Sequence, residues 1–391
     1  MKKILISLIL LICLTGCWNY HELNNYSIVT GVAIDKSDTG YEVSVLIANT
    51  PKNDTDKESG SSKIVVYSGE GDTIYTAIKD IGLISAKELY MGHFAVLVIS
   101  EDVAINGIDE VIDMFLRESS TKKNFFVSIT KDCKAKDTLK IITPLSNFPS
   151  QNIADNLIST SKLQGIISNV TFNELVSNLK RDGIENSINS LNIIGNSSEG
   201  SKKENVEESE PKTYIKLGTL GLFKDDKLVH WTTKEESIGI NIVKNKTSEM
   251  YVKVKYKNST IVFETVDIKT IVNVKLDDKN PIVNIDISGK AKIAEVINNV
   301  GLNSDEVINL LKDKINRKVI DYVNQGIDIA IKNNTDVFGL GLQFYKEYPN
   351  YYKNVKNNWE NNLSNLKINI NSNIILKTKG SSKESLEGKY D

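Results

Sequence analysis

The feature that most constrains this chain is a short apolar segment close to its N-terminus. Two lysines, Lys2 and Lys3, precede a run over residues 4–14 in which every residue except Ser7 is apolar. In a helix these eleven residues would span ~16 Å, about half of the ~30 Å hydrocarbon core of a bilayer. The run is therefore too short for a stable membrane span, but its length and basic flank are typical of a secretory signal. We expect the folded part of the protein to begin after it.

A cysteine follows this segment directly, in Leu14-Thr15-Gly16-Cys17. This tetrapeptide resembles a bacterial lipobox, in which diacylglycerol is attached to the cysteine sulfur and the signal is cleaved just before that residue. The sequence therefore predicts a signal peptide at residues 1–16 and a lipidated Cys17 as the first mature residue. The alternatives are an ordinary signal peptide and a buried N-terminal helix. The basic start, the short apolar run and the placement of the cysteine together favour the lipoprotein.

The net charge and the cysteine count agree with lipid anchoring. The net charge is −2 with a pI near 6.1, and loss of Lys2 and Lys3 with the signal leaves about −4. We therefore expect no nucleic acid partner and no polybasic membrane anchor. One acyl chain holds a protein only marginally, whereas two or three hold it firmly. Of the three cysteines, Cys133 alone would keep a free thiol, so we expect no disulfide and no cysteine metal cluster.

Length and composition predict a globular protein of several domains. The chain has 391 residues, of which 40% are hydrophobic and 25% charged, as expected for two or three packed domains. Residues 196–212 are mostly Asn, Ser, Gly, Lys and Glu, and Val206 is the one aliphatic side chain among them. This composition predicts a flexible linker. The expected domains are an N-terminal one at 17–195, with room for two subdomains, and a C-terminal one at 213–391.

The first half alternates between strand and helix patterns. Two runs, 27–35 and 41–48, flank a polar turn and predict a hairpin. Apolar residues at three- and four-residue spacing predict a helix at 73–85, with Asp72 as its N-cap. Further strands are expected at 64–67, 94–99 and 125–129, and further helices at 107–118, 135–142 and 171–181. This order predicts a mixed-sheet α/β region with at least one crossover connection.

The second half predicts an α+β arrangement. A hairpin is expected at 218–231, a short helix at 235–242, and period-two strands between residues 250 and 294. Asn303 and Glu306 form a pattern like a capping box, and an apolar stripe then continues to about Asn333. Such a helix would be ~45 Å long. With a last strand at 368–376, the sequence predicts an antiparallel sheet packed on one long helix.

The residues that usually carry catalysis are sparse. The chain has no phosphate-binding loop, zinc-protease, nucleophile-elbow or C-x-x-C motif. Its histidines, His21, His93 and His230, are far apart in sequence, and we interpret them as structural. Paired aspartates, Asp225-Asp226 and Asp277-Asp278, lie in predicted turns, where Asp is favoured for local hydrogen bonding. The sequence therefore predicts no catalytic residue, no cofactor and no metal site.

An aromatic cluster late in the chain has two interpretations. It consists of Tyr345, Tyr348, Tyr351, Tyr352 and Trp359. A sugar-binding platform or a partner hot spot would use exposed rings. Packing of a helix against the sheet would bury them, and we favour packing.

Four groups of residues form a pattern over nearly the whole mature chain. They are Gly16-Cys17-Trp18 with Glu22-Leu23 and residues 29–35; residues 89–100 with Gly107-Ile108 and residues 115–117; residues 221–229; and residues 336–341 with Tyr348-Pro349 and Trp359. Together they resemble the Ger(x)C family of spore germination lipoproteins, the C subunits of nutrient germinant receptors. Family members often have Gly at the position of His230, a difference with no bearing on the predicted function.

The resemblance implies a receptor subunit. Such lipoproteins lie on the outer face of the spore inner membrane, beside a membrane-spanning A subunit and a transporter-like B subunit. The complex responds to small nutrients and triggers release of ions and dipicolinate. The family fold is an α/β assembly of three subdomains.

Three hypotheses follow for function. The first is a non-enzymatic, lipid-anchored receptor subunit that acts through protein contacts. The alternative is a lipid-anchored extracytoplasmic solute-binding protein, which would need a ligand cleft between two α/β lobes. The third is a cell-wall hydrolase, which would need a glutamate with a raised pKa in a deep pocket. The lack of catalytic motifs favours the first.

Overall fold

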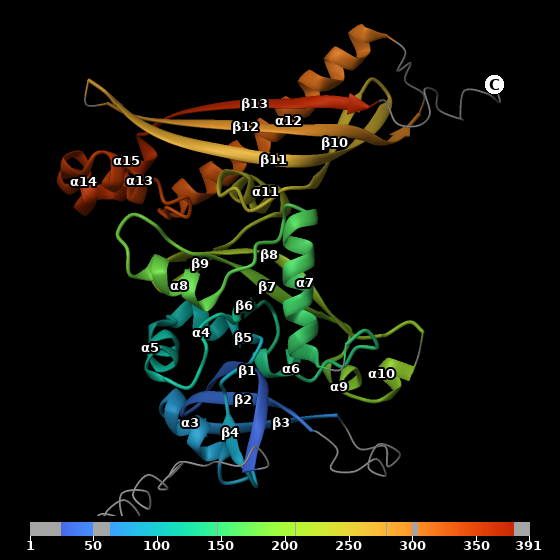
Figure 1. Cartoon of the computed structure of the whole chain (residues 1–391), viewed down its shortest axis with the longest axis vertical. Helices are drawn as coiled ribbons and strands as arrows, with labels where there is room; N and C mark the ends of the chain where they lie inside the picture. Colours follow the sequence, from blue (N-terminus) through green and yellow to red (C-terminus); the bar gives the residue numbers. More distant parts are fainter. Residues whose placement is uncertain are drawn as a thin grey trace, which may run out of the picture.

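The computed structural model describes residues 25–49, 63–146, 148–207, 209–278, 280–298 and 304–378. The predicted signal peptide and Cys17 lie outside these residues. The described chain contains one sheet of nine strands and one of four, placed one above the other along the long axis of the molecule (Figure 1). Helices cover the first sheet and back the second. This mixed α/β architecture with two sheets confirms the predicted fold class.

The first sheet is parallel in its centre and antiparallel at both edges. Its strand order is β3-β2-β1-β5-β6-β7-β8-β9, and β4 pairs with the start of β1. Neighbours are parallel from β1 through β5 and β6 to β7, and antiparallel beyond. The strands are β1 (Tyr26–Ser37), β2 (Gly40–Ala48), β3 (Ile64–Gly71), β4 (Glu88–Tyr90), β5 (Val96–Ile99), β6 (Phe126–Thr130), β7 (Ser187–Ile194), β8 (Tyr214–Lys224) and β9 (Lys227–Trp231).

Helices bury both faces of the parallel centre. In β5, Leu97 and Ile99 join one apolar cluster and Val96 and Val98 the other, as the period of a strand requires. The first cluster includes residues of α3 (Ile74–Ile81), α4 (Glu101–Asn106), α5 (Asp109–Arg117) and α8 (Phe172–Leu179). The second includes residues of α6 (Ala135–Thr138) and α7 (Pro149–Leu163). The predicted helix at 73–85 is α3, whose N-cap is Thr73, with a reciprocal capping box to Thr76, rather than Asp72.

The interval predicted to be a flexible linker is a folded connection within the first sheet. Residues 196–212 join β7 to β8, which are adjacent strands of the first sheet, and they include the short helices α9 (Ser197–Gly200) and α10 (Glu204–Glu207). The buried amide of Asn205 donates to the carbonyls of Ile142 and Thr213. Polar side chains in this connection thus form hydrogen bonds with backbone groups. Composition alone does not distinguish such side chains from those of a flexible linker. The chain leaves the first sheet after β9.

The second sheet has the order β10-β11-β12-β13. Its strands are β10 (Met250–Tyr256), β11 (Ser259–Asp277), β12 (Asn280–Ile297) and β13 (Lys367–Thr378). The first three pair antiparallel as predicted, but β13 lies parallel to β12. The reason is the intervening helical segment, which returns the chain to the end at which β12 began. That segment is α12 (Asp305–Lys332), α13 (Leu340–Glu347), α14 (Pro349–Val355), a 3-10 turn (Lys356–Asn358) and α15 (Trp359–Ser364).

The long helix α12 backs the second sheet, as predicted. Its N-cap is Ser304 rather than Asn303. Leu311, Ile315 and Val319 are fully buried at helical spacing. Within the described residues, no helix is both long enough and apolar enough to cross a bilayer.

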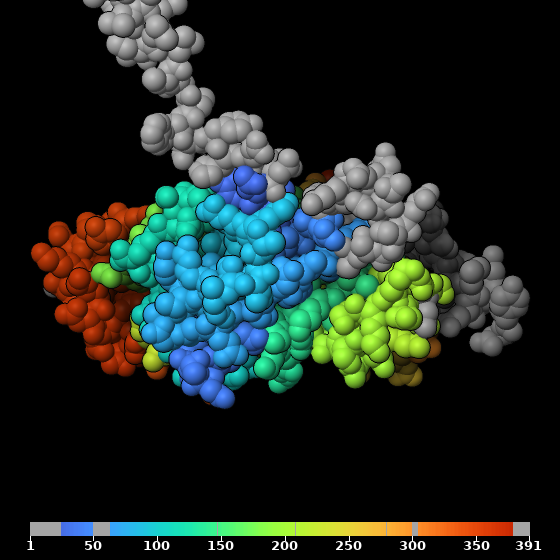
Figure 2. Space-filling model, turned by 90° about the horizontal axis from the view of Figure 1, so that it is seen from below, coloured from blue at the N-terminus to red at the C-terminus, as the bar shows by residue number. Residues whose placement is uncertain are grey.

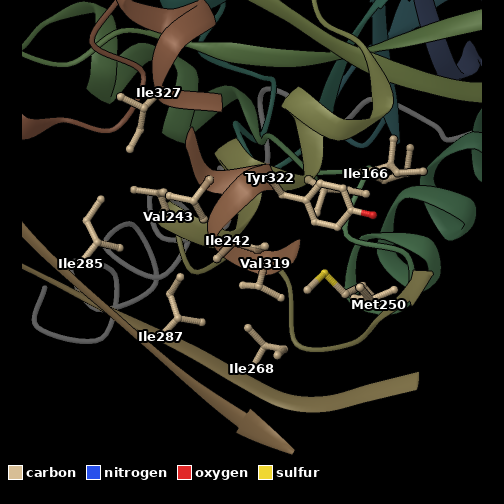
Figure 3. Packing of buried hydrophobic residues seen from close by; sticks show 14 of the residues in the cluster. Ile166, Ile242, Val243, Met250, Ile268, Ile285, Ile287, Val319, Tyr322 and Ile327 are labelled. Atoms are coloured by element: carbon tan, nitrogen blue, oxygen red, sulfur yellow. The ribbon is translucent and has the colours of Figure 1, made fainter. Parts of the chain in front are cut away.

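The two halves share one continuous apolar core. Helix α11 (Lys234–Val243) lies between the sheets, and Ile242 and Val243 pack with Ile285 and Val319 of the second half (Figure 3). Ile166, from the segment after α7, belongs to the same cluster. The chain therefore passes from the first sheet to the second through buried residues of this shared core.

Candidate functional site

A groove of about 750 Å³ lies where the first sheet meets the helices at one end of the second. Its walls come from α5, from the segment between α8 and β7, from the β8–β9 turn, and from α14 and α15. Segments far apart in sequence therefore meet here, which makes this junction the candidate site of the described chain.

A buried carboxylate, that of Asp336, organises the floor of the groove. Asp336 is 2% exposed, and its oxygens accept hydrogen bonds from the backbone N–H of Leu340 at 3.0 Å and of Gly341 at 2.7 Å. The indole Nε1 of Trp359 donates to the same carboxylate at 2.9 Å. Burial raises the pKa of Asp336, and these donors oppose that shift. The carboxylate thereby satisfies the N-terminal donors of α13 and ties α15 to them.

A second set of charges links this floor to the first sheet. The Lys224 ammonium, at the end of β8, lies 2.7 Å from a carboxylate oxygen of Glu185 and 2.7 Å from one of Glu360. The other oxygen of Glu185 accepts the backbone N–H of Asp336, whose carbonyl in turn accepts the N–H of Glu185 at 2.9 Å. Glu185 and Asp336, 151 residues apart, are thus joined by one backbone–backbone hydrogen bond and one from backbone to side chain.

The environment of these charges shifts their pKa values in the same direction. Burial raises the pKa of Glu185, with Lys224 opposing the shift. Burial alone would lower the pKa of Lys224, but the two carboxylates outweigh it and the pKa is raised. Lys224 therefore stays charged between its two partners.

Two glycines allow the backbones at this junction to touch. A Cβ on Gly183 would lie 2.6 Å from the carbonyl carbon of Gly341, and one on Gly341 would lie 2.8 Å from the Cα of Gly183. Gly183 also has a φ of +77°, which L side chains rarely adopt. The N–H of Leu342 donates to the carbonyl of Gly183 at 2.9 Å. Close approach, rather than ligand contact, accounts for both glycines.

The aromatic cluster is a packing element, as favoured from the sequence. Tyr352 is 3% exposed and Trp359 is 8% exposed, with ring centroids 5.4 Å apart. Phe344 packs edge-on against Trp359 at 5.8 Å, and all three rings belong to the shared core. Tyr345 is the exception, because it is 57% exposed.

Other residues considered from the sequence stay apart from the junction or serve turns. Asp225, in the β8–β9 turn, has a φ of +52°, consistent with the turn role predicted for it. His93 is exposed, His230 is half-buried, and His21 lies outside the described residues. No cluster of three or more His, Cys, Asp or Glu side chains suited to a metal ion occurs in the described ranges. Burial raises the pKa of the free thiol of Cys133 to about 11, so it is a poor nucleophile.

The sequence predicted no site at this junction, although some of its residues belong to the family pattern. Asp336, Gly341 and Trp359 belong to the last group of the family pattern, and Lys224 belongs to the third; the structure brings them together. Gly183 and Glu185 were missed. The Asp-Gly pair at 182–183 marks a turn, but nothing in the local sequence indicates that Glu185 faces Asp336.

The arrangement suits mechanical coupling of two segments. The buried carboxylates are engaged by backbone and indole donors and by Lys224, so their hydrogen-bonding capacity is used in holding the junction together. Such a fully connected polar network fixes a unique arrangement of the elements around it.

Comparison with known proteins agrees with the pattern found in the sequence. Residues 19–193 match the family model described as spore germination protein N-terminal domain. Residues 218–380 match the model described as spore germination B3/GerAC like, C-terminal. The two models together cover most of the chain.

Individual relatives are similar over nearly their full length. The chain is 23% identical to spore germination protein KC of Bacillus subtilis (strain 168) over 364 residues, covering 90% of this chain and 89% of that protein. It is 22% identical to spore germination protein B3 of the same organism, covering 90% of both. The crystal structure of the GerBC protein superposes with a TM-score of 0.54 at 16% identity, over 92% of this chain and all of that one. The chain belongs to the Ger(x)C family of spore germination proteins.

Proposed function

We propose that this protein is a non-enzymatic, lipid-anchored subunit of a spore nutrient germinant receptor, acting through contacts with membrane-spanning A and B subunits. The observation that carries the proposal is the junction at Asp336. Lys224, Asp336 and Trp359 of the family pattern meet there with Glu185 from the first half of the chain, in a hydrogen-bonded network rather than around an open reactive group. A junction of this kind allows a change in contacts at one end of the molecule to be transmitted to the other end.

The lipid on Cys17 would confine this body to the outer face of the spore inner membrane. Tethering to a plane raises the effective concentration of a protein near its membrane partners without any new contact. Two or three acyl chains give attachment that outlasts a signalling event. The anchor would therefore keep the protein near its membrane partners, and the folded domains would select those partners through specific contacts.

Replacement of Cys17 tests the anchor. We expect the Cys17→Ala protein to leave the spore membrane fraction and nutrient-triggered germination to fall, because the protein is no longer held beside its partners. A Cys133→Ala variant is the matched control and should leave both unchanged. Retention of Cys17→Ala in the membrane would contradict the anchor. Loss of retention with normal germination would show that function does not need it.

The solute-binding alternative is supported by one observation, the groove itself. Its volume of about 750 Å³ suits a small molecule, and its walls carry both acidic and basic side chains, among them Asp109, Asp182 and Lys356. Calorimetry of the mature protein with amino acids and sugars separates the two functions. Saturable micromolar binding that is lost in Asp182→Ala would favour solute binding, and its absence would favour the contact function.

A further inference from the structure

One end of the molecule carries exposed apolar side chains beside the exit of the N-terminal tether. Leu83 is 84% exposed and Ile84 is 56% exposed, and they lie together in the turn that follows α3. We call Leu83 and Ile84 the apolar tip. Contiguous exposed apolar side chains are candidates for an interaction surface.

Hydrogen bonds hold the backbone of the turn that carries these two side chains. The N–H groups of Leu83 and Ile84 donate to the carbonyls of Asp80 and Ile81 at 2.9 and 3.1 Å. The inner face of α3 is held by Ile74, Ala77, Ile78 and Ile81, which are buried in the core of the first sheet. A turn whose backbone donors are engaged can enter an apolar medium without leaving those donors unsatisfied.

The tether brings the apolar tip within reach of a bilayer. Tyr26, at the start of β1, is nine residues from Cys17, a distance of at most ~32 Å for a fully extended chain. Tyr26 is paired with Glu88 of β4, and Ile28 is paired with Tyr90. Strand β4 follows the apolar tip within a few residues, so a lipid on Cys17 holds the tip close to the membrane.

Aromatic side chains lie on the elements next to the tip in the fold, α3, β1 and β4. The rings of Tyr26 and Tyr90 are 5.7 Å apart, and Tyr90 is 36% exposed. Tyr75 on α3 is 56% exposed, with the Lys79 ammonium over its ring at 5.1 Å. Tyrosine rings and lysine stems are the side chains that occupy the headgroup level of a bilayer. Figure 2 views this end of the molecule, where α3 and the neighbouring strands form the near surface.

We propose that the apolar tip, Leu83 and Ile84, inserts into the bilayer interface and fixes the orientation of the protein on the membrane. The first sheet then faces the lipid, and the second sheet projects away along the long axis (Figure 1). The lysines and acids around the tip, including Lys79, Lys87, Asp80 and Glu88, nearly balance in charge. Insertion is therefore driven by apolar burial and depends little on anionic lipid. The inference rests on the proposed lipidation of Cys17.

An environment-sensitive probe at Ala86 tests this orientation. Ala86 is exposed and three residues beyond Leu83, so Ala86→Cys carries a nitrobenzoxadiazole label without removing the tip. The Cys133→Ser background prevents labelling elsewhere. The mature lipidated protein, with the lipid on Cys17 verified by mass spectrometry, is reconstituted in phosphatidylcholine vesicles and in vesicles with phosphatidylglycerol. We expect about twofold stronger quenching by lipid-borne spin labels than at Ile271→Cys, since interfacial elements are buried ~5–10 Å into the headgroup boundary.

Two matched double variants separate the apolar tip from general surface hydrophobicity. Leu83→Asp/Ile84→Asp should move the Ala86 probe into water while the lipid still retains the protein on vesicles. Ile271→Asp/Ile375→Asp changes two residues that are 61% and 47% exposed on the second sheet, and it should leave the probe in the lipid.

The outcomes distinguish failure of the inference from failure of the anchor. An unmodified Cys17 in the mass spectrum would refute the anchor. A lipidated protein whose Ala86 probe is as accessible to aqueous iodide as the Ile271 probe would overturn bilayer insertion. Protection of the probe only when A and B subunits share the vesicle would also overturn it, and would identify the tip as a protein contact.

Discussion

At the residue scale, the three hydrogen bonds accepted by Asp336 predict a loss of stability when its carboxylate is replaced. An Asn at this position has one acceptor oxygen, so the Asp336→Asn variant leaves at least one of the three buried donors facing an NH₂ group. We expect a loss of about 1–3 kcal/mol in the free energy of unfolding, because a buried donor without an acceptor retains its full desolvation cost. Asp336→Ala should lose more, since it removes every acceptor. Urea denaturation at neutral pH measures both.

The control for Asp336 is Asp225, an aspartate of the β8–β9 turn. Asp225 has a φ of +52°, a conformation that Asn tolerates, so Asp225→Asn should change stability by no more than about 0.5 kcal/mol. Equal effects of the two Asn variants would contradict the role assigned to Asp336. The sequence singled out Asp336 through the family pattern but gave no indication of its partners, because contacts across 151 residues depend on the tertiary fold.

At the element scale, the crossing of α11 and α12 sets the spacing between the two sheets. A Cβ on Gly239 would lie 1.9 Å from the backbone carbonyl oxygen of Tyr322, and one on Gly326 would lie 2.7 Å from the N of Ile240. Only glycine lets the two helix backbones approach this closely. At this point of the crossing the two helices therefore meet backbone to backbone.

Substitution at this crossing should force the helices apart. Alanine in a helix normally gains about 0.5–1 kcal/mol over glycine. For Gly239→Ala we expect instead a loss of about 2 kcal/mol, since overpacking against backbone atoms displaces whole elements. Thermal or urea unfolding measures the change, and Lys234→Ala on the exposed first turn of α11 is the control. A stabilised Gly239→Ala protein would mean that the crossing is looser than the structure indicates.

Elements in which apolar residues recur at a regular spacing were predictable from the sequence. Elements with buried polar residues or few buried apolar residues were not. The helices α3, α5 and α12 followed from apolar spacing. Strand β7 was missed because its buried positions include Ser187, Asn189 and Ser190, which hide the period-two pattern. Helix α7 was missed because its buried apolar stripe is narrow. The direction of β13 depends on where the preceding helices return the chain. The local sequence of β13 gives no indication of that direction.

At the scale of the whole molecule, the shared core predicts that both halves unfold together. The two tryptophans of the described chain report on different clusters, since Trp231 packs against the first sheet's core and Trp359 belongs to the core shared with the second sheet. Two independent domains joined by a linker would give each tryptophan its own midpoint. A continuous core with the Asp336 junction should give one transition.

Two variants with a single tryptophan test this cooperativity. Trp18→Phe/Trp359→Phe leaves Trp231 as the reporter, and Trp18→Phe/Trp231→Phe leaves Trp359. In each variant we expect the fluorescence transition in urea to coincide with the loss of far-ultraviolet circular dichroism, because neither half can expose its share of the core alone. A Trp359 transition that precedes the loss of secondary structure would mean that the helices α13–α15 open separately. Addition of Asp336→Ala to the Trp359 reporter should create that early transition, because it removes the carboxylate that joins α13 to α15.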